Sequence, residues 1–246
     1  MKKTVFVATC VFSIAMIVAI WIGGSYFNKA RGHSKTVSVV GMAERDFTSD
    51  LIVWDLSYDV LNMDMKQGYS DIKDKNKVVR DYLVSKGVKE SDIDFQAIDC
   101  DKEQDYHYNG ESHESYYTFA GYRLTQRVRI ETSDVDKVEK ISREIAELLD
   151  KDIQLNRNNL SYYYTQLSNL KIEMLAEATQ NAKERAKTIA KNAGSHLGGL
   201  QTANMGVFQI TAPNSTDEDY SWGGTFNTSS KKKRASINMR LTYYVR

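Results

Sequence analysis

An uncharged apolar run near the N-terminus constrains this chain more than any other feature of its sequence. It covers Val5–Ile22, which is 18 residues without a charged side chain. As an α-helix this run would measure about 27 Å, close to the ~30 Å hydrocarbon core of a bilayer. Trp21, Tyr26 and Phe27 lie where an interfacial aromatic belt would fall. The sequence therefore predicts a membrane segment over residues 4–22, through which the chain would contact the lipid bilayer.

A cleaved signal peptide is the competing interpretation of the same run. Its apolar region would be about 7–15 residues long and would end at a small-x-small site. Here the run is longer and ends in Ala-Ile-Trp-Ile-Gly-Gly, residues 19–24. The length and the missing cleavage site favour a retained anchor within residues 1–27, followed by a polar linker over 28–35. Cleavage stays open as the alternative.

The flanking charges say little about orientation. Lys2 and Lys3 precede the apolar run, and Lys29, Arg31 and Lys35 follow it, so the positive-inside rule is nearly balanced. A short basic N-terminus before a single span usually stays in the cytoplasm. On that ground we expect the remainder of the chain to lie outside the cytoplasm.

The composition beyond the linker is that of an ordinary globular protein. Hydrophobic residues make up 41% of the chain and charged residues 26%, and the net charge of +1 provides no global field that would attract nucleic acid. We expect one soluble domain over 36–246. Cys10 and Cys100 cannot plausibly meet, so no intramolecular disulfide framework is expected. Cys100 is interpreted as a strand residue, with an intermolecular or redox role as the minor alternative.

Hydrophobic periodicity predicts the elements of the first half of the domain. They are two strands (36–40 and 52–61), a helix (65–86) ended by Gly87, a strand beginning at 93–97, a polar hairpin tip (104–117) around Asn109-Gly110 and a long strand (122–130). In the long strand, Leu124, Val128 and Ile130 share one face with Tyr122 and Gln126. The opposite face carries Arg123, Arg127 and Arg129.

The second half begins with a helix capped by Ser133 or Asp134. Its apolar face is Val138, Ile141, Ile145, Leu148 and Leu149. The elements after it are a strand (153–165), the longest helix (168–193), another strand (203–211), a polar loop (213–232) and a last strand (236–245). The longest helix ends at Gly194 and has a predicted small-residue face made of Ala176, Ala182, Ala186, Ile189, Ala190 and Ala193.

The resulting order is β-β-α-β-β-α-β-α-β-β. Hairpins mixed with helices predict an α+β fold, with helices packed on mainly antiparallel sheets and one N-terminal transmembrane helix before them.

Four segments of this order resemble a known family. They are an opening strand with its glycine (Val37–Glu44), a helix-to-strand crossing (Lys86–Ile93), a central strand (Phe119–Val128) and the end of the alanine-spaced helix (Ala190–Gly199). Together they resemble the SIMPL-domain family of extracytoplasmic bacterial proteins, which includes the periplasmic immunogenic proteins. One departure is Ser49-Asp50, where many members have Pro-Asp before the second strand. A proline there would only rigidify a turn, so the resemblance stands.

The resemblance implies an envelope protein without a known enzymatic reaction. Some relatives assemble into large rings, and others are linked to oxidative-stress tolerance. It therefore implies a homo-oligomer whose soluble domain lies in the periplasm. Together with the anchor predicted from the apolar run, this places the chain at the bacterial inner membrane as a single-pass protein. Many similar proteins carry a cleaved signal there, so cleavage stays open. It carries over no catalytic, cofactor-binding or metal-binding residues.

Histidines provide the only candidate chemistry for a metal. His107 and His113 lie in the tyrosine-rich tip with Asp105, Glu111 and Glu114 nearby, and imidazole with carboxylate can hold a transition metal. The spacing fits no standard motif, and a polar hairpin tip is the favoured interpretation. His33 lies in the linker. His196 follows a helix end, where a histidine interacts favourably with the helix dipole.

Basic and aromatic clusters have structural interpretations that compete with binding. The stripe Arg123, Arg127 and Arg129 is expected to be a solvated face paired with acids rather than an anion site. Lys231–Arg234 is expected to keep a loop soluble and protect a strand edge, with anionic headgroups or polyanions as the alternative. The tyrosines at 116–117 and 162–164 are expected to be partly core and partly subunit interface.

No nucleophile elbow, phosphate-binding loop, dinucleotide fingerprint, H-E-x-x-H or C-x-x-C occurs in the sequence. We therefore expect a non-enzymatic, self-associating envelope protein with no cofactor and no nucleic-acid partner. Two alternatives remain: a metal-dependent or hydrolytic enzyme with a spatially assembled site, and an accessory module for another envelope protein.

Overall fold

The structure is a computed structural model that describes residues 16–22, 35–110, 113–214 and 224–246. Residues 16–22 are helical. Among the described residues, no helix is both long and apolar enough to cross a membrane. Most of the predicted membrane segment (4–15) and of the predicted linker (28–34) lies outside the described residues, as do Cys10 and His33. The part of the polar loop at 215–223 lies outside them too.

The remaining chain divides into two compact units. Unit 1 combines residues up to Met42 with Ala178–Gly206 and Met239–Arg246, and unit 2 combines Ala43–Glu177 with Val207–Asn238. The chain crosses between the units four times. Three crossings fall inside regular elements, namely β1 (Thr36–Thr48), α4 (Leu167–Asn192) and β9 (Lys232–Val245), and the fourth falls between Gly206 and Val207. The single domain expected over 36–246 is thus built from two units.

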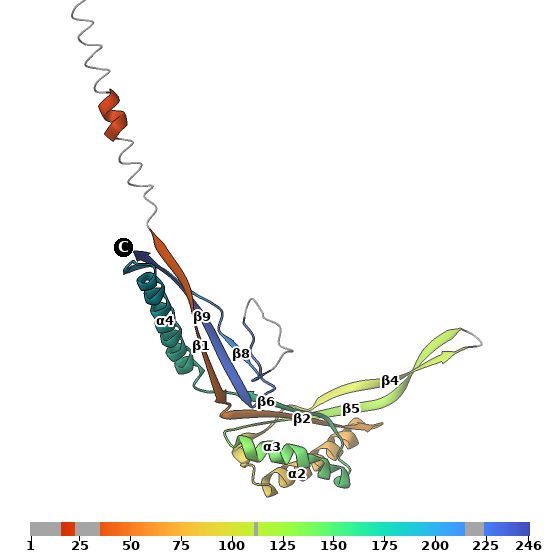
Figure 1. Ribbon diagram of the computed structural model, residues 1–246. Helices are drawn as coiled ribbons and strands as arrows, with labels where there is room; N and C mark the ends of the chain where they lie inside the picture. Colours follow the sequence, from red (N-terminus) through yellow and green to blue (C-terminus); the bar gives the residue numbers. More distant parts are fainter. Residues whose placement is uncertain (1–15, 23–34, 111–112, 215–223) are drawn as a thin grey trace, which may run out of the picture. The chain divides into compact units, whose positions relative to one another are not determined.

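The larger sheet lies within unit 2 and is antiparallel. Its strand order is β3-β5-β2-β6, and β4 pairs with β5 (Figure 1). The strands are β2 (Leu51–Asn62), β3 (Ile93–Phe95), β4 (Asp99–Asn109), β5 (Glu114–Thr132) and β6 (Leu155–Tyr163). β2 is central, pairing Trp54 with Ile130 on one side and with Leu160 on the other. The predicted alternation explains this position, because Ile52, Trp54, Leu56 and Tyr58 are all buried.

Two helices cover one face of this sheet. They are α2 (Met65–Ser85) and α3 (Val135–Glu144), and α3 continues as a 3₁₀ turn, η2 (Ile145–Lys151). Figure 1 shows both helices against the sheet, and both contact β2. α2 begins at Asp64, whose carboxylate accepts hydrogen bonds from the backbone N–H groups of Lys66 and Gln67. It ends before Gly87, which has φ 91°.

A buried polar chain crosses this core. The Tyr58 hydroxyl donates to Asn76 Oδ1 at 2.7 Å, and Asn76 Nδ2 donates to Gln126 Oε1 at 2.8 Å. Gln126 Nε2 then donates to the carbonyls of Gln96 and Arg127. Burial raises the pKa of Tyr58, so this hydroxyl stays a neutral donor. The amides and the hydroxyl are therefore satisfied although Tyr58 and Gln126 are buried.

Unit 1 contains the α4–β1 packing. The second sheet has the order β1-β9-β7, with β7 (Leu197–Met205) on β9, and α4 contributes a buried row of Ala178, Ala182, Ala186 and Ala190. A Cβ built on Gly41 of β1 would lie 2.1 Å from the Ala178 carbonyl oxygen and 2.5 Å from the Ala182 nitrogen. Glycine opposite alanine lets helix and strand backbones approach closely.

Several sequence expectations were wrong in detail. Ala176 and Ala193 are exposed, Ile189 is 48% exposed and Leu149 is 57% exposed, whereas Ala178 is buried. The strand expected at 203–211 is two strands, β7 and β8 (Gln209–Thr211), and β8 pairs with β9. The strand expected to begin at Ile93, Phe95 and Ala97 is also two strands, because β3 ends at Phe95 and β4 begins at Asp99. The hairpin expected around Asn109-Gly110 is confirmed, since β4 and β5 pair as far as Asn109 and Glu114, but most of residues 104–117 are paired strand rather than tip.

Candidate functional site

The most exposed ordered feature of unit 2 is the end of the β4–β5 hairpin, which we call the arm (residues 104–110 and 113–119). Every described arm residue is exposed. Figure 1 shows the arm extending past β2 and β6, beyond the rest of the larger sheet. Five large aromatic side chains project from it, exposed by 38–65%: Tyr106, Tyr108, Tyr116, Tyr117 and Phe119. Soluble surfaces rarely collect such side chains without a partner.

The aromatic rings order the arm itself. Tyr106 is paired in register with Tyr117, and their ring centroids lie 5.3 Å apart. His107 stacks on Tyr116 with centroids 5.2 Å apart. These cross-strand pairs stabilise a two-stranded ribbon, against which no helix or third strand packs among the residues that the structure describes. The ribbon is thus a defined surface with its aromatic faces open.

The histidines are not assembled into a metal site. His107 Nε2 lies 2.8 Å from Thr118 Oγ1. A hydroxyl is a poorer metal ligand than the carboxylates of Asp105, Glu111 and Glu114. His113 occupies the turn with φ 57°, and Glu111 lies outside the described residues. In the part of the chain that the structure describes, no group of three or more His, Cys, Asp or Glu side chains is placed to hold a metal ion. His196 lies between α4 and β7, where its backbone bonds Arg246.

The arginine stripe is paired with acids, as predicted. Arg123 bonds both Asp59 and Glu103, and Arg127 Nη1 lies 2.8 Å from Asp99. The Arg129 guanidinium is 3.8 Å from Glu131. The hydrogen bonds that Arg123 donates to Glu103 and Asp59 raise the pKa of Arg123. Each of the three arginines on this face therefore has an acidic partner.

The basic run Lys231–Arg234 does not protect a strand edge, because it enters β9, which lies between β1 and β7. Lys231 binds Asp136 and Glu139 of α3, and Arg234 Nε is 2.6 Å from Asp46. Lys233 is 1% exposed and its ammonium donates to the Asn227 carbonyl. The run is therefore mostly internal structure, and the expectation of a solvated loop was wrong.

Tyr162 is core, whereas Tyr163 and Tyr164 are partly buried against Phe226 and Phe47. Cys100 is exposed and reduced on β4, as expected for a strand residue.

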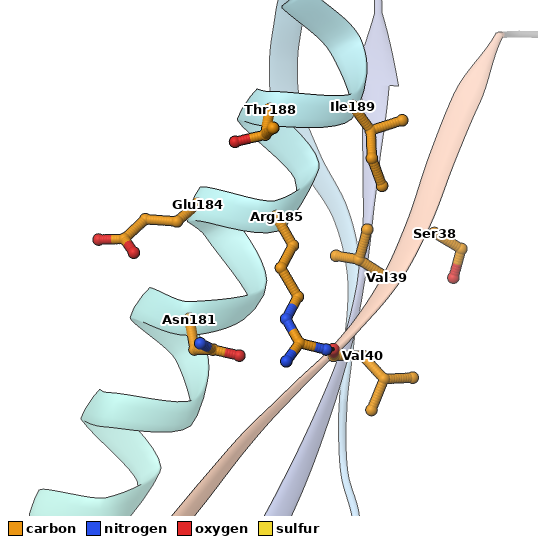
Figure 2. Close-up of a pocket in the computed structure, with 8 residues that line it drawn as sticks. All are labelled: Ser38, Val39, Val40, Asn181, Glu184, Arg185, Thr188 and Ile189. Atoms are coloured by element: carbon orange, nitrogen blue, oxygen red, sulfur yellow. The ribbon is translucent and has the colours of Figure 1, made fainter. Parts of the chain in front are cut away.

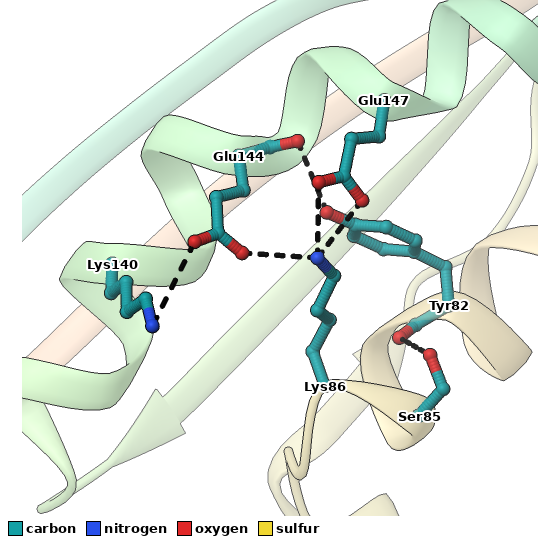
Figure 3. Close-up of polar contacts among 6 residues, drawn as sticks. All are labelled: Tyr82, Ser85, Lys86, Lys140, Glu144 and Glu147. Carbon is teal, nitrogen blue, oxygen red and sulfur yellow. Dashed lines mark hydrogen bonds and ion pairs between the residues drawn. The ribbon is translucent and has the colours of Figure 1, made fainter.

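A charged cluster ties the end of α2 to α3 and η2. Lys86 Nζ lies 3.0 Å from Glu144 Oε2 and 2.9 Å from Glu147 Oε2, and the Tyr82 hydroxyl donates to the Glu144 carbonyl at 3.1 Å (Figure 3). The hydrogen bonds that Lys86 donates to Glu147 and Glu144 raise the pKa of Lys86, and the bond from Lys86 lowers the pKa of Glu144. An ammonium held in this way is a structural tie rather than a base.

Unit 1 carries a pocket of about 510 Å³ between α4 and β1. Its lining residues are Ser38, Val39, Val40, Asn181, Glu184, Arg185, Thr188 and Ile189. Figure 2 shows Arg185 reaching from the helix toward the strand, where Nη1 donates to the Val40 carbonyl at 2.9 Å. Asn181 Oδ1 accepts from the Met42 N–H. Two α4 side chains thus bond backbone groups on the outer edge of β1, beside an apolar floor.

A family model described as SIMPL, a protein of unknown function (DUF541), matches residues 37–240. The chain belongs to the SIMPL family. The match includes β1, α4 and most of β9, so it covers both units of the SIMPL domain and confirms the resemblance read from the sequence. No curated protein matches the chain.

Sequence reasoning missed the pocket, the Lys86 tie and the length of the arm. Only the arm left a readable signal. Tyr106, His107 and Tyr108 are followed, after the turn, by Tyr116 and Tyr117. Aromatic side chains on both sides of a turn are typical of paired strands rather than of a loop.

Proposed function

We propose that this SIMPL protein is a non-enzymatic envelope protein, anchored in the bacterial inner membrane by residues 4–22, facing the periplasm, and self-associating through its arm. The single observation that carries the proposal is the arm, an ordered ribbon with five exposed aromatic side chains. Tyrosine and phenylalanine are enriched at the centres of subunit interfaces. A role in the envelope or in oxidative-stress tolerance follows the family resemblance alone.

A second copy of the chain is the partner that this surface favours. β4 pairs only with β5 in the described sheet, so its other edge has unpaired backbone groups. An identical β4 edge from another copy could pair with it antiparallel, bringing the same tyrosines together across a two-fold axis. Ring assembly by some relatives supports self-association.

The mass of the full chain in mild detergent tests the self-association. We expect an oligomer by size-exclusion chromatography with light scattering, and a shift to monomer for Tyr106→Ser/Tyr117→Ser/Phe119→Ser. Tyr69→Ser is the matched control, because Tyr69 is 50% exposed on α2, outside the arm. A monomeric wild type at high concentration, or an oligomer that survives the triple substitution, would refute the arm as the interface.

The anchor is tested separately by sequencing the N-terminus of the protein purified from membranes. We expect the N-terminal segment to be retained and the protein to resist alkaline carbonate extraction. A mature N-terminus near residues 25–31 would replace the anchor with a cleaved signal.

A further inference from the structure

The charges of this chain are divided unevenly between its two units. The described part of unit 1 after the N-terminal helix (35–42, 178–206 and 239–246) contains one acidic residue, Glu184, and seven cations: Lys35, Lys183, Arg185, Lys187, Lys191, Arg240 and Arg246. Unit 2 contains 22 Lys and Arg residues against 31 Asp and Glu residues. The net charge of the whole chain is close to zero, but unit 1 is basic. A basic surface attracts anions over about a Debye length.

Three of these cations form a stripe on α4. Lys183, Lys187 and Lys191 are exposed and spaced by four residues, so they neighbour one another on the helix surface. Like charges at this spacing destabilise a helix. Helix α3 of unit 2 arranges its cations differently, since Lys137 pairs with Asp134 and Arg143 with Glu139. The stripe therefore concentrates positive charge where intrahelical pairing would have been possible.

The same unit exposes large apolar side chains beside its cations. Val40, Met42, Ile189, Leu200 and Met205 are exposed by 41–64%. Val40 and Ile189 line the pocket together with the Arg185 guanidinium and the Thr188 hydroxyl (Figure 2). A unit that carries both surplus positive charge and exposed apolar side chains matches the interface of a bilayer, where phosphates lie above acyl chains. A nucleic acid would use the charge but not these apolar groups.

The connection to the N-terminal segment limits how far unit 1 can be from the bilayer. β1 starts at Thr36, and the helix at 16–22 lies thirteen residues before Lys35. Thirteen residues reach at most about 45 Å when fully extended. Val245 donates to the Lys35 carbonyl, and Arg246 and His196 bond each other's backbones, so Lys35, His196 and Arg246 gather where the chain enters the unit.

We propose that unit 1 is a second membrane contact, which binds anionic phospholipid headgroups through the α4 lysine stripe. This inference rests on the proposed anchor, which places unit 1 near the bilayer. The anchor provides attachment to any bilayer, and the basic surface adds a preference for anionic lipid. Each surface lysine is expected to favour the docked state about fivefold.

The test uses the full chain in nanodiscs made of phosphatidylcholine alone or with a third of phosphatidylglycerol. Acetylation rates of individual lysines, followed by peptide mass spectrometry, report docking. We expect Lys183, Lys187 and Lys191 to react several-fold more slowly in the anionic discs and to recover near 1 M salt, where the Debye length is about 3 Å. Lys66, Lys73 and Lys77 are exposed on α2 and are the internal controls, which should not change.

A double substitution assigns the effect to the stripe. In Lys183→Gln/Lys187→Gln, protection of Lys191 should be lost, because two lysines together contribute about 25-fold to docking. The matched Lys66→Gln/Lys73→Gln variant should keep Lys191 protected.

Three outcomes would overturn the inference. They are equal Lys191 reactivity in both kinds of disc, protection that survives the stripe substitution, and equal protection in neutral discs by soluble polyphosphate, which would assign the surface to polyanions. The anchor fails independently if the chain leaves the neutral discs. If the chain stays in both discs and Lys191 is unaffected, only the headgroup contact is wrong.

Discussion

At the corner between β1 and β2, the backbone of Ser49 is hydrogen-bonded but its side-chain hydroxyl is not. Its N–H donates to the Lys231 carbonyl at 2.9 Å. Its hydroxyl is buried and has no hydrogen-bond partner among the described residues. The sequence comparison with the Pro-Asp of other members suggested only a rigidified turn. The structure shows that a proline here would also remove a backbone donor.

We therefore expect opposite effects from two substitutions of Ser49. Ser49→Ala removes an unsatisfied hydroxyl and should leave the free energy of unfolding unchanged or raise it by about 0.5–1 kcal/mol. Ser49→Pro loses the bond to Lys231 and should lower it by about 1–2 kcal/mol. Urea denaturation of the full chain in mild detergent measures both. Destabilisation by alanine equal to that by proline would show that the hydroxyl has a partner.

The Lys86 tie gives the α2–α3 packing a defined pH dependence. Lys86 lowers the pKa of Glu144 in the folded state, so this contribution is present above the unfolded value near 4.5 and is lost as pH falls through the lower folded value. The pKa of Lys86 is raised, so its contribution is complete below 10.5 and is lost only at more alkaline pH. The tie therefore acts between about pH 5 and pH 10.

Lys86→Met should lower the melting temperature at pH 7, and the difference from wild type should shrink as the pH falls through the lowered pKa of Glu144, because protonation of Glu144 removes its attraction to Lys86. Melting curves from pH 3 to pH 8 check this, with Lys140→Met as the control, because Lys140 is 3.9 Å from Glu144 and more exposed. A difference between wild type and Lys86→Met that is constant across the range would assign the effect to packing rather than charge.

At the scale of elements, α4 shows how tertiary packing selects a helix face. The buried residues recur every four positions, from Ala178 to Ala190 within unit 1. A spacing of four winds about 40° per step around a helix of 3.6 residues per turn. Such a row follows a twisted strand better than a straight stripe does. This explains why Ala178 is buried although the sequence favoured Ala176.

Gly41 is the strand residue that permits this packing. Gly41→Ala places a Cβ against the α4 backbone, so one of the two elements must shift. We expect a loss of about 1–3 kcal/mol, or more, seen as faster hydrogen exchange in residues 178–190. Gly199→Ala is the matched control in the same unit, since a Cβ there has nothing within 4 Å. Equal exchange in both variants would contradict the close approach.

At the scale of the whole molecule, the arm should be separable from the fold. The β4–β5 pairing places Glu103 opposite Gly121, so residues 104–120 can be replaced by an Asn-Gly turn. The core residues of β5 begin at Leu124 and remain. We expect the shortened chain to keep its melting temperature within about 4 °C, which corresponds to roughly 1 kcal/mol, and to be monomeric. An unfolded product would mean that the arm stabilises unit 2, and a folded oligomer would place the interface elsewhere.

The sequence by itself determined the elements whose faces repeat at short range. Alternation predicted β2, β5 and β9, helical spacing predicted α2 and α3, and glycines marked helix ends at Gly87 and Gly194. These signals are local, because each compares residues only a few positions apart. The family followed from the order of such segments.

Only the tertiary structure decided which distant groups meet. Lys86 with Glu144, Lys231 with Asp136 and Arg234 with Asp46 are separated by 58, 95 and 188 residues. The basic run Lys231–Arg234 therefore looked like a free patch, although most of it is paired. A surplus of positive charge lies instead on unit 1, which is assembled from three segments far apart in sequence. Periodicity records which face of an element is buried, whereas the partner of that face depends on how the chain folds back on itself.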